Sequence, residues 1–96
     1  YEKVIKRIEN IAKDPSVSEV AISLLNELII IIYPDDIFNE KENLLLGSLL
    51  IIAYEHLQIG HEALRIAENL NLSLNDLMNV VSKYKKYLEN NPPIKA

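Results

Sequence analysis

The chain has 96 residues, a formal net charge of −4 and no cysteine. Because 49% of it is hydrophobic and it has only 2 glycines and 4 prolines, the composition is typical of a folded helical domain and excludes a disordered chain. The length allows one hydrophobic core, so we expect one domain over residues 1–91 and a tail over 92–96, while the missing cysteines exclude a disulfide scaffold or zinc finger.

Two helices are predicted in the first third of the chain. Apolar residues from Val4 to Ala12 recur at helical spacing, which predicts an amphipathic helix over about residues 1–13. Ser16 followed by Glu19 has the spacing of a capping box and predicts that a second helix opens there and runs to about residue 33. The β-branched run 29–32 would also suit a short strand, but its continuity with the preceding stripe favours helix.

A third helix is predicted to form the centre of the domain. Asn39 and Glu42 make a second cap signal, and residues 44–57 then leave almost no polar face. A helix that is apolar all round is usually buried, and Gly47 and Ser48 would let a neighbouring helix come close. Neither this run nor the stretch 20–32 is long enough to cross a bilayer, so no membrane partner is expected.

The segment 61–88 is predicted to be a helix-turn-helix, with helices over about 61–70 and 74–89 that follow Gly60. Ala67 is the small residue needed where two helices approach, and Asn71 is predicted to be the corner, in the left-handed region. Ser73 would cap the second helix by accepting from the amide of Asn75 or Asp76. Any two amphipathic helices with a short turn show similar spacing, so a purely structural pair is the alternative. The expected inward-facing residues are Ile66, Leu70, Leu72, Leu77 and Val80.

The order of these helices resembles the cyclin-type repeat of general transcription factor IIB and its archaeal counterpart, transcription factor B. The resemblance rests on YEKVIKRIENIA, SEVAISLLNELI, ENLLLGSLLIIAYEHL and ALRIAENLNLSLNDLMNVVSKYKKYL, which cover nearly the whole chain in the order of the family's five helices. It implies an all-α, five-helix cyclin-like bundle with a buried third helix. It also implies an intracellular protein, cytoplasmic or nuclear, that acts as a DNA-associated module in transcription initiation or regulation.

Double-stranded DNA is therefore the first partner expected. Asn75 and Asn79 could pair with adenine edges, and Ser82 or Lys83 could reach phosphate. The chain departs from the family's pattern, because it lacks arginines along this helix and its connection PDDIFNEKEN is acidic. The candidate nucleic-acid-binding residues are Ser73, Asn75, Asn79, Ser82, Lys83 and Lys86.

The alternative function is a non-catalytic protein-interaction module or accessory subunit of a transcription or replication complex, without direct DNA contact. This interpretation accounts for the net negative charge, which opposes nonspecific binding to phosphates. Exposed apolar residues would mark the interface. The candidates are Ile37, Phe38, Ile59 and Met78.

Catalysis is not expected, because the chain has no cysteine nucleophile, no glycine-rich phosphate loop and no serine in a nucleophile setting. His56 and His61 flank the predicted break at Gly60, whereas helical metal sites usually place two histidines four residues apart. We therefore expect no metal site, no cofactor and no small-molecule substrate. Tyr84 and Tyr87 are predicted to form a partly buried seam with Leu88.

Overall fold

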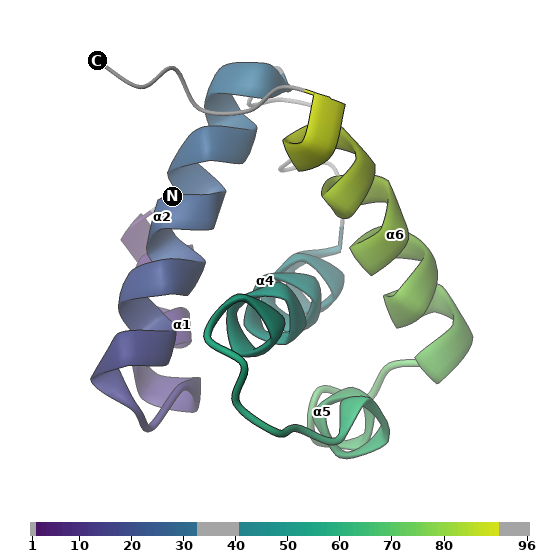
Figure 1. Cartoon of the computed structure of the whole chain (residues 1–96). Coiled ribbons are helices and arrows are strands. Elements are labelled where there is room, and N and C mark those ends of the chain that lie inside the picture. Colours follow the sequence, from purple (N-terminus) through teal and green to yellow (C-terminus); the bar gives the residue numbers. More distant parts are fainter. Residues whose placement is uncertain (1, 33–40, 91–96) are drawn as a thin grey trace.

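The structure is a computed structural model that describes residues 2–32 and 41–90, and it contains five helices there (Figure 1). No strand occurs within these two ranges, which confirms the predicted all-α class. The helices are α1 (Glu2–Ile11), α2 (Pro15–Ile31), α4 (Glu42–His56), α5 (Ala63–Asn69) and α6 (Leu74–Asn90).

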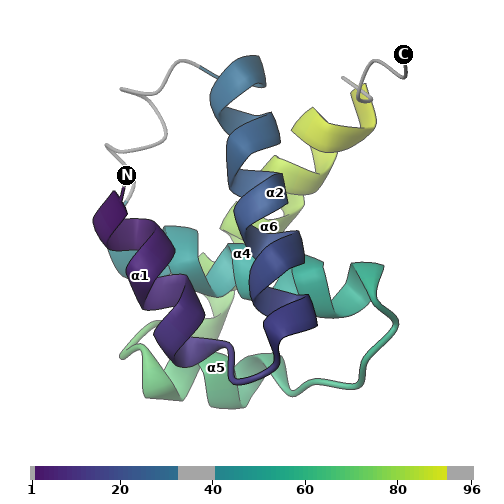
Figure 2. The same cartoon turned by 90° about the vertical axis from the view of Figure 1, so that its left-hand side faces the viewer.

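Helix α4 lies among the other four helices. Figure 1 looks nearly along its axis, with α1 and α2 on one side, α6 on the other and α5 below. Figure 2 shows α1 and α2 lying across the face of α4 opposite α6. Every residue from Leu44 to Ala53 is buried, because α4 packs against all four of the other helices. No helix within 2–32 and 41–90 has the length and apolar character needed to cross a membrane.

The start of α2 differs from the predicted capping box. The helix begins at Pro15, one residue before Ser16, and its N-cap is Asp14, whose side chain accepts from the Ser16 backbone N–H at 2.9 Å. Proline suits the first helical position because its missing N–H would have no partner there. The helix continues through the β-branched run to Ile31, and Ile32 is extended. The predicted helix is confirmed over residues 29–31 of this run, and the cap predicted at Ser16 is wrong.

The start of α4 also differs from its cap signal. A capping box would make Glu42 the third residue of the helix, but Glu42 is its first residue and the N-cap is Lys41. Asn39 lies outside the described residues. The Glu42 carboxylate instead forms an ion pair with Arg7, which joins α1 to the start of α4.

The end of α4 is a left-handed turn at Gln58, two residues before the glycine expected to separate the helices. Gln58 has φ 58°, its N–H donates to Glu55 O at 3.1 Å, and the Ile59 N–H donates to Tyr54 O at 2.9 Å. These two bonds are those of a Schellman motif. Gly60 has no positive φ, so its conformational freedom is not what ends the helix.

Gly47 sits where α4 meets the α5–α6 pair. A Cβ added there would lie 2.8 Å from Leu77 Cδ1, 3.3 Å from Leu70 Cδ1 and 3.5 Å from Leu72 Cδ1. The next residue, Ser48, is fully buried and donates its hydroxyl to the Leu44 carbonyl at 2.7 Å. The close approach expected at Gly47 is confirmed, and the leucines of the α5–α6 pair make it.

Candidate nucleic-acid interface

The turn between α5 and α6 is built around Asn71. Its φ is 55°, the left-handed conformation expected of it, and its N–H donates to Glu68 O at 3.1 Å. The Leu72 N–H donates to Ala67 O at 2.8 Å, which completes a second Schellman motif. Asparagine takes this conformation at lower cost than most residues with a side chain, so the local sequence explains the corner.

Two contacts with α4 fix the position of this turn. The Asn43 side-chain amide donates to Leu70 O at 3.0 Å, which gives a partner to a carbonyl at the C-terminal end of α5. Leu70 and Leu72 also pack beside Gly47. Because both contacts come from the N-terminal half of α4, the direction in which α6 leaves the turn depends on the core.

Ser73 lies directly before α6 and caps it as expected. Its hydroxyl accepts from the Asp76 N–H at 3.4 Å, and the Leu77 N–H donates to its carbonyl at 3.0 Å. Asp76 lies in the first turn of α6, where a negative charge is favourable to the helix dipole. The structure thus gives Ser73 a capping contact at the start of α6.

The other five candidate residues share one exposed face of α6. Asn75, Asn79 and Lys86 lie opposite the buried stripe that contains Leu77 and Tyr84. Spacings of four, three and four residues between 75, 79, 82 and 86 keep these side chains on one face. The structure therefore brings together on one surface the residues Asn75, Asn79, Ser82, Lys83 and Lys86.

This surface includes a shallow hollow of about 360 Å³ towards the C-terminal end of α6. Tyr87 and Asn90 line it beside Lys83 and Lys86, although neither was among the candidate residues. Their distance of four residues from Lys83 and Lys86 is the signal that could have found them. In the predicted tyrosine seam, Tyr84 is buried and Leu88 half-buried, but Tyr87 is 36% exposed.

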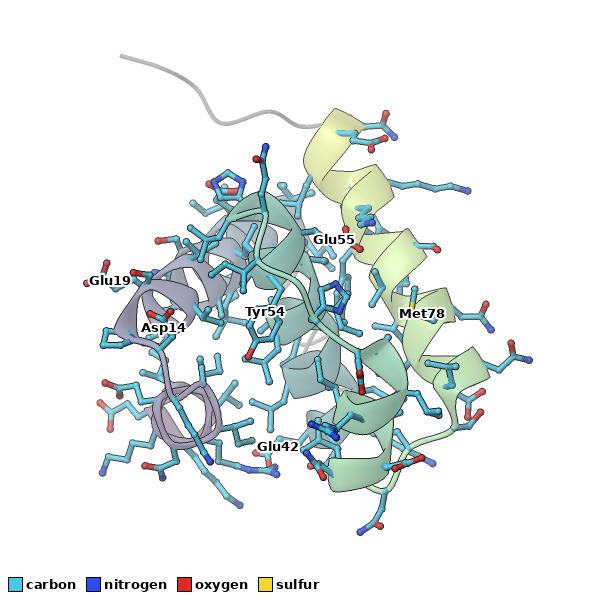
Figure 3. All side chains as sticks on the ribbon, turned by 60° about the horizontal axis from the view of Figure 1, so that its bottom comes forward. Asp14, Glu19, Glu42, Tyr54, Glu55 and Met78 are labelled. Carbon is cyan, nitrogen blue, oxygen red and sulfur yellow. The ribbon has the colours of Figure 1, made fainter. Side chains whose placement is uncertain are left out.

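The apolar interface candidates are distributed over different parts of the molecule. Ile37 and Phe38 lie outside the described residues. Ile59 and Met78 are each 37% exposed: Ile59 lines a hollow of about 520 Å³ near Tyr54 and His61, whereas Met78 lies on α6 (Figure 3). The sequence did not single out Leu64, which is 55% exposed on α5.

The two histidines have separate surroundings. His61 stacks on Tyr54 with ring centroids 5.6 Å apart and an interplanar angle of 28°. His56 is exposed at the end of α4 and lines a different hollow. Within the part of the chain that the structure describes, no three histidine or carboxylate side chains are grouped so that they could hold a metal ion.

In comparisons with known proteins, no family model, curated protein or solved structure matches this chain.

Proposed function

We propose that the α5–α6 pair is a helix-turn-helix and that the exposed face of α6 binds in a groove of double-stranded DNA. The observation that carries this proposal is the gathering of Asn75, Asn79, Ser82, Lys83 and Lys86 on one surface that faces away from the core. Amide side chains suit base edges and lysines suit phosphates, so the surface combines both kinds of contact. With the helix order that resembles a factor-IIB-type cyclin repeat, this points to a module of transcription initiation or regulation.

The two lysines set the size of the electrostatic contribution. Two phosphate contacts predict that the logarithm of the binding constant falls with the logarithm of salt concentration with a slope of about −1.8. Affinity should therefore fall about tenfold between 50 and 200 mM salt. Binding of this kind would be weak without additional contacts from a partner or a second domain.

Fluorescence anisotropy with a labelled duplex at two salt concentrations tests the proposal. Reversing both charges with Lys83→Glu and Lys86→Glu should remove the binding, because the phosphates would then face carboxylates. The matched control is Lys3→Glu with Lys6→Glu, since these exposed residues on α1 give the same change in net charge on another helix. Absence of binding at low salt, or equal loss in the control, would exclude this face as the contact surface.

A second candidate function, docking of a protein partner without DNA contact, is favoured by the exposed apolar side chains of the α5–α6 pair. Leu64 is 55% exposed, Leu74 38% and Met78 37%. Replacing Leu64 and Met78 by glutamine should leave helicity unchanged and abolish capture of a partner from cell extract. Unchanged capture would remove both residues from the proposed interface.

A further inference from the structure

A groove runs between α2, the C-terminal half of α4 and the end of α6, on a different side of α6 from Asn79 and Lys86. It has a volume of about 610 Å³. We call it the α2–α6 groove. Its floor is made by four apolar side chains from three helices: Val20, Leu24, Ile52 and Leu88.

The four apolar side chains of the floor come from three helices and lie at helical spacing on α2. Val20 and Leu24 lie four residues apart on α2, so they contribute to the floor at the spacing of successive helical turns. Ile52 of α4 and Leu88 of α6 complete the floor. A surface of this kind receives the apolar residues that an amphipathic helix presents every three or four positions.

The rim of the groove is acidic on both sides. Glu19 and Glu27 lie along α2, eight residues and therefore about 12 Å apart, and Glu89 lies on α6. Lys85 also lines the groove, but it forms an ion pair with Glu55, which Figure 3 shows at the C-terminal end of α4. The groove therefore presents an excess of negative charge around an apolar floor.

We propose that the α2–α6 groove binds a basic amphipathic helix of a partner protein. Apolar side chains of that helix would cover the floor, while its lysines or arginines would lie opposite Glu19, Glu27 and Glu89. One small cation does not fit this arrangement, because two carboxylates about 12 Å apart along a helix cannot share it. The apolar floor likewise favours a peptide over a polyamine, which has no apolar side chains to bury.

The test uses the full chain and a synthetic peptide that contains only leucine and lysine. A peptide of about 18 residues, or five helical turns, would carry its leucines on one face and its lysines on the other. In nuclear magnetic resonance titrations, the amide shifts should move at Val20, Leu24, Ile52 and Leu88 and stay unchanged at Asn75 and Asn79. Shifts at Asn75, Asn79 and Lys86 without shifts at Val20, Leu24 and Ile52 would overturn the proposal.

Charge reversal on the rim of the groove gives a second test of the proposal. Glu19→Lys with Glu27→Lys should weaken peptide binding about tenfold, since the reversal removes two favourable charge contacts and adds repulsion in their place. The matched control is Glu2→Lys with Glu9→Lys, which makes the same change in net charge on exposed residues of α1. Equal weakening in the control would show nonspecific attraction and overturn the proposal.

Two further measurements distinguish the proposed peptide from other occupants of the groove. Sedimentation of the chain alone should show a monomer, and a dimer lost in the Glu19→Lys, Glu27→Lys variant would assign the groove to a second copy instead. Spermine at the same concentration of positive charge should fail to displace the peptide. Full displacement would show that the groove binds polycations in general and would overturn the proposal. Lys83→Glu with Lys86→Glu should leave peptide binding intact, so this inference stands or falls separately from the proposed DNA contact.

Discussion

Within residues 2–32 and 41–90, two residues with side chains, Asn71 and Gln58, occupy the left-handed region. The conformational cost of that region differs between them. Asparagine visits that region at low cost, whereas a long side chain such as glutamine loses about 1–2 kcal/mol there. The sequence could predict the first corner because Asn71 carries a local preference. It could not predict the second, because glutamine has no such preference and Gly60 offered a more obvious position for the break.

Gln58→Gly should raise the free energy of unfolding by about 1 kcal/mol, since glycine removes the left-handed strain at the end of α4. Urea denaturation measures this change in the free energy of unfolding. The companion change Gly60→Ala should be neutral or add about 0.5 kcal/mol, because Gly60 has no positive φ and a Cβ there meets nothing within 4 Å. A loss of stability in Gln58→Gly would contradict the left-handed turn.

Gly47→Ala should lower the free energy of unfolding by about 1–2 kcal/mol, although alanine is the better helix former. The added methyl would lie 2.8 Å from Leu77 Cδ1, and Leu77 is fully buried and cannot move away freely. Thermal unfolding of Gly47→Ala, Leu77→Ala and the double variant measures the coupling. Leu77→Ala should relieve the crowding, so an additive double variant would show that the two side chains do not meet.

At the scale of elements, helical periodicity predicts the bodies of the helices, while the caps depend on one or two atoms. The sequence predicts the second helix correctly but places its start at Ser16, because serine three residues before glutamate is a common cap signal. In the structure the Asp14 carboxylate accepts a hydrogen bond from the Ser16 N–H, and Pro15 is the first residue of the helix. Competing cap signals one or two residues apart cannot be ranked from spacing alone.

Asp14→Ala should therefore lower the free energy of unfolding by about 1 kcal/mol through loss of the α2 cap. Ser16→Ala is the matched control and should change stability by less than about 0.5 kcal/mol. Chemical denaturation followed by circular dichroism measures both changes. A larger effect at Ser16 would restore the capping box that the sequence suggested.

The sequence also predicts the candidate site on α6, but it does not predict the α2–α6 groove. The face of α6 could be predicted because all its members lie on one helix, whose geometry fixes which residues share a face. The α2–α6 groove could not be predicted in this way. Its floor combines Val20 and Leu24 with Ile52 and Leu88, and their proximity depends on how α2 and α6 cross α4.

At the scale of the whole molecule, α4 is the element that the other four helices share. The Cα radius of gyration is 12.4 Å, close to the value of about 12 Å expected for a folded domain of this length. Leu49 near the middle of α4 is fully buried, whereas Leu64 on α5 is 55% exposed. Stability should therefore depend on α4 far more than on surface leucines.

Leu49→Ala should lower the free energy of unfolding by about 2–5 kcal/mol, because it leaves a cavity where several helices meet. The free energy of unfolding of a folded domain is about 5–15 kcal/mol in total, so this loss should appear as a large fall in the unfolding midpoint. Leu64→Ala, the matched control, should change stability by less than about 0.5 kcal/mol. Comparable losses in both variants would contradict the central position of α4.

The burial of α4 on every side also matters during protein synthesis. A helix without a polar face cannot remain exposed to water for long without sticking to other chains, and translation proceeds at about 5–20 residues per second. Helices α1 and α2 are made before α4, whereas the α6 residues that cover its other side follow later. Chain order thus provides a partner for one side of α4 as it emerges, and its other side stays uncovered until α6 has been made.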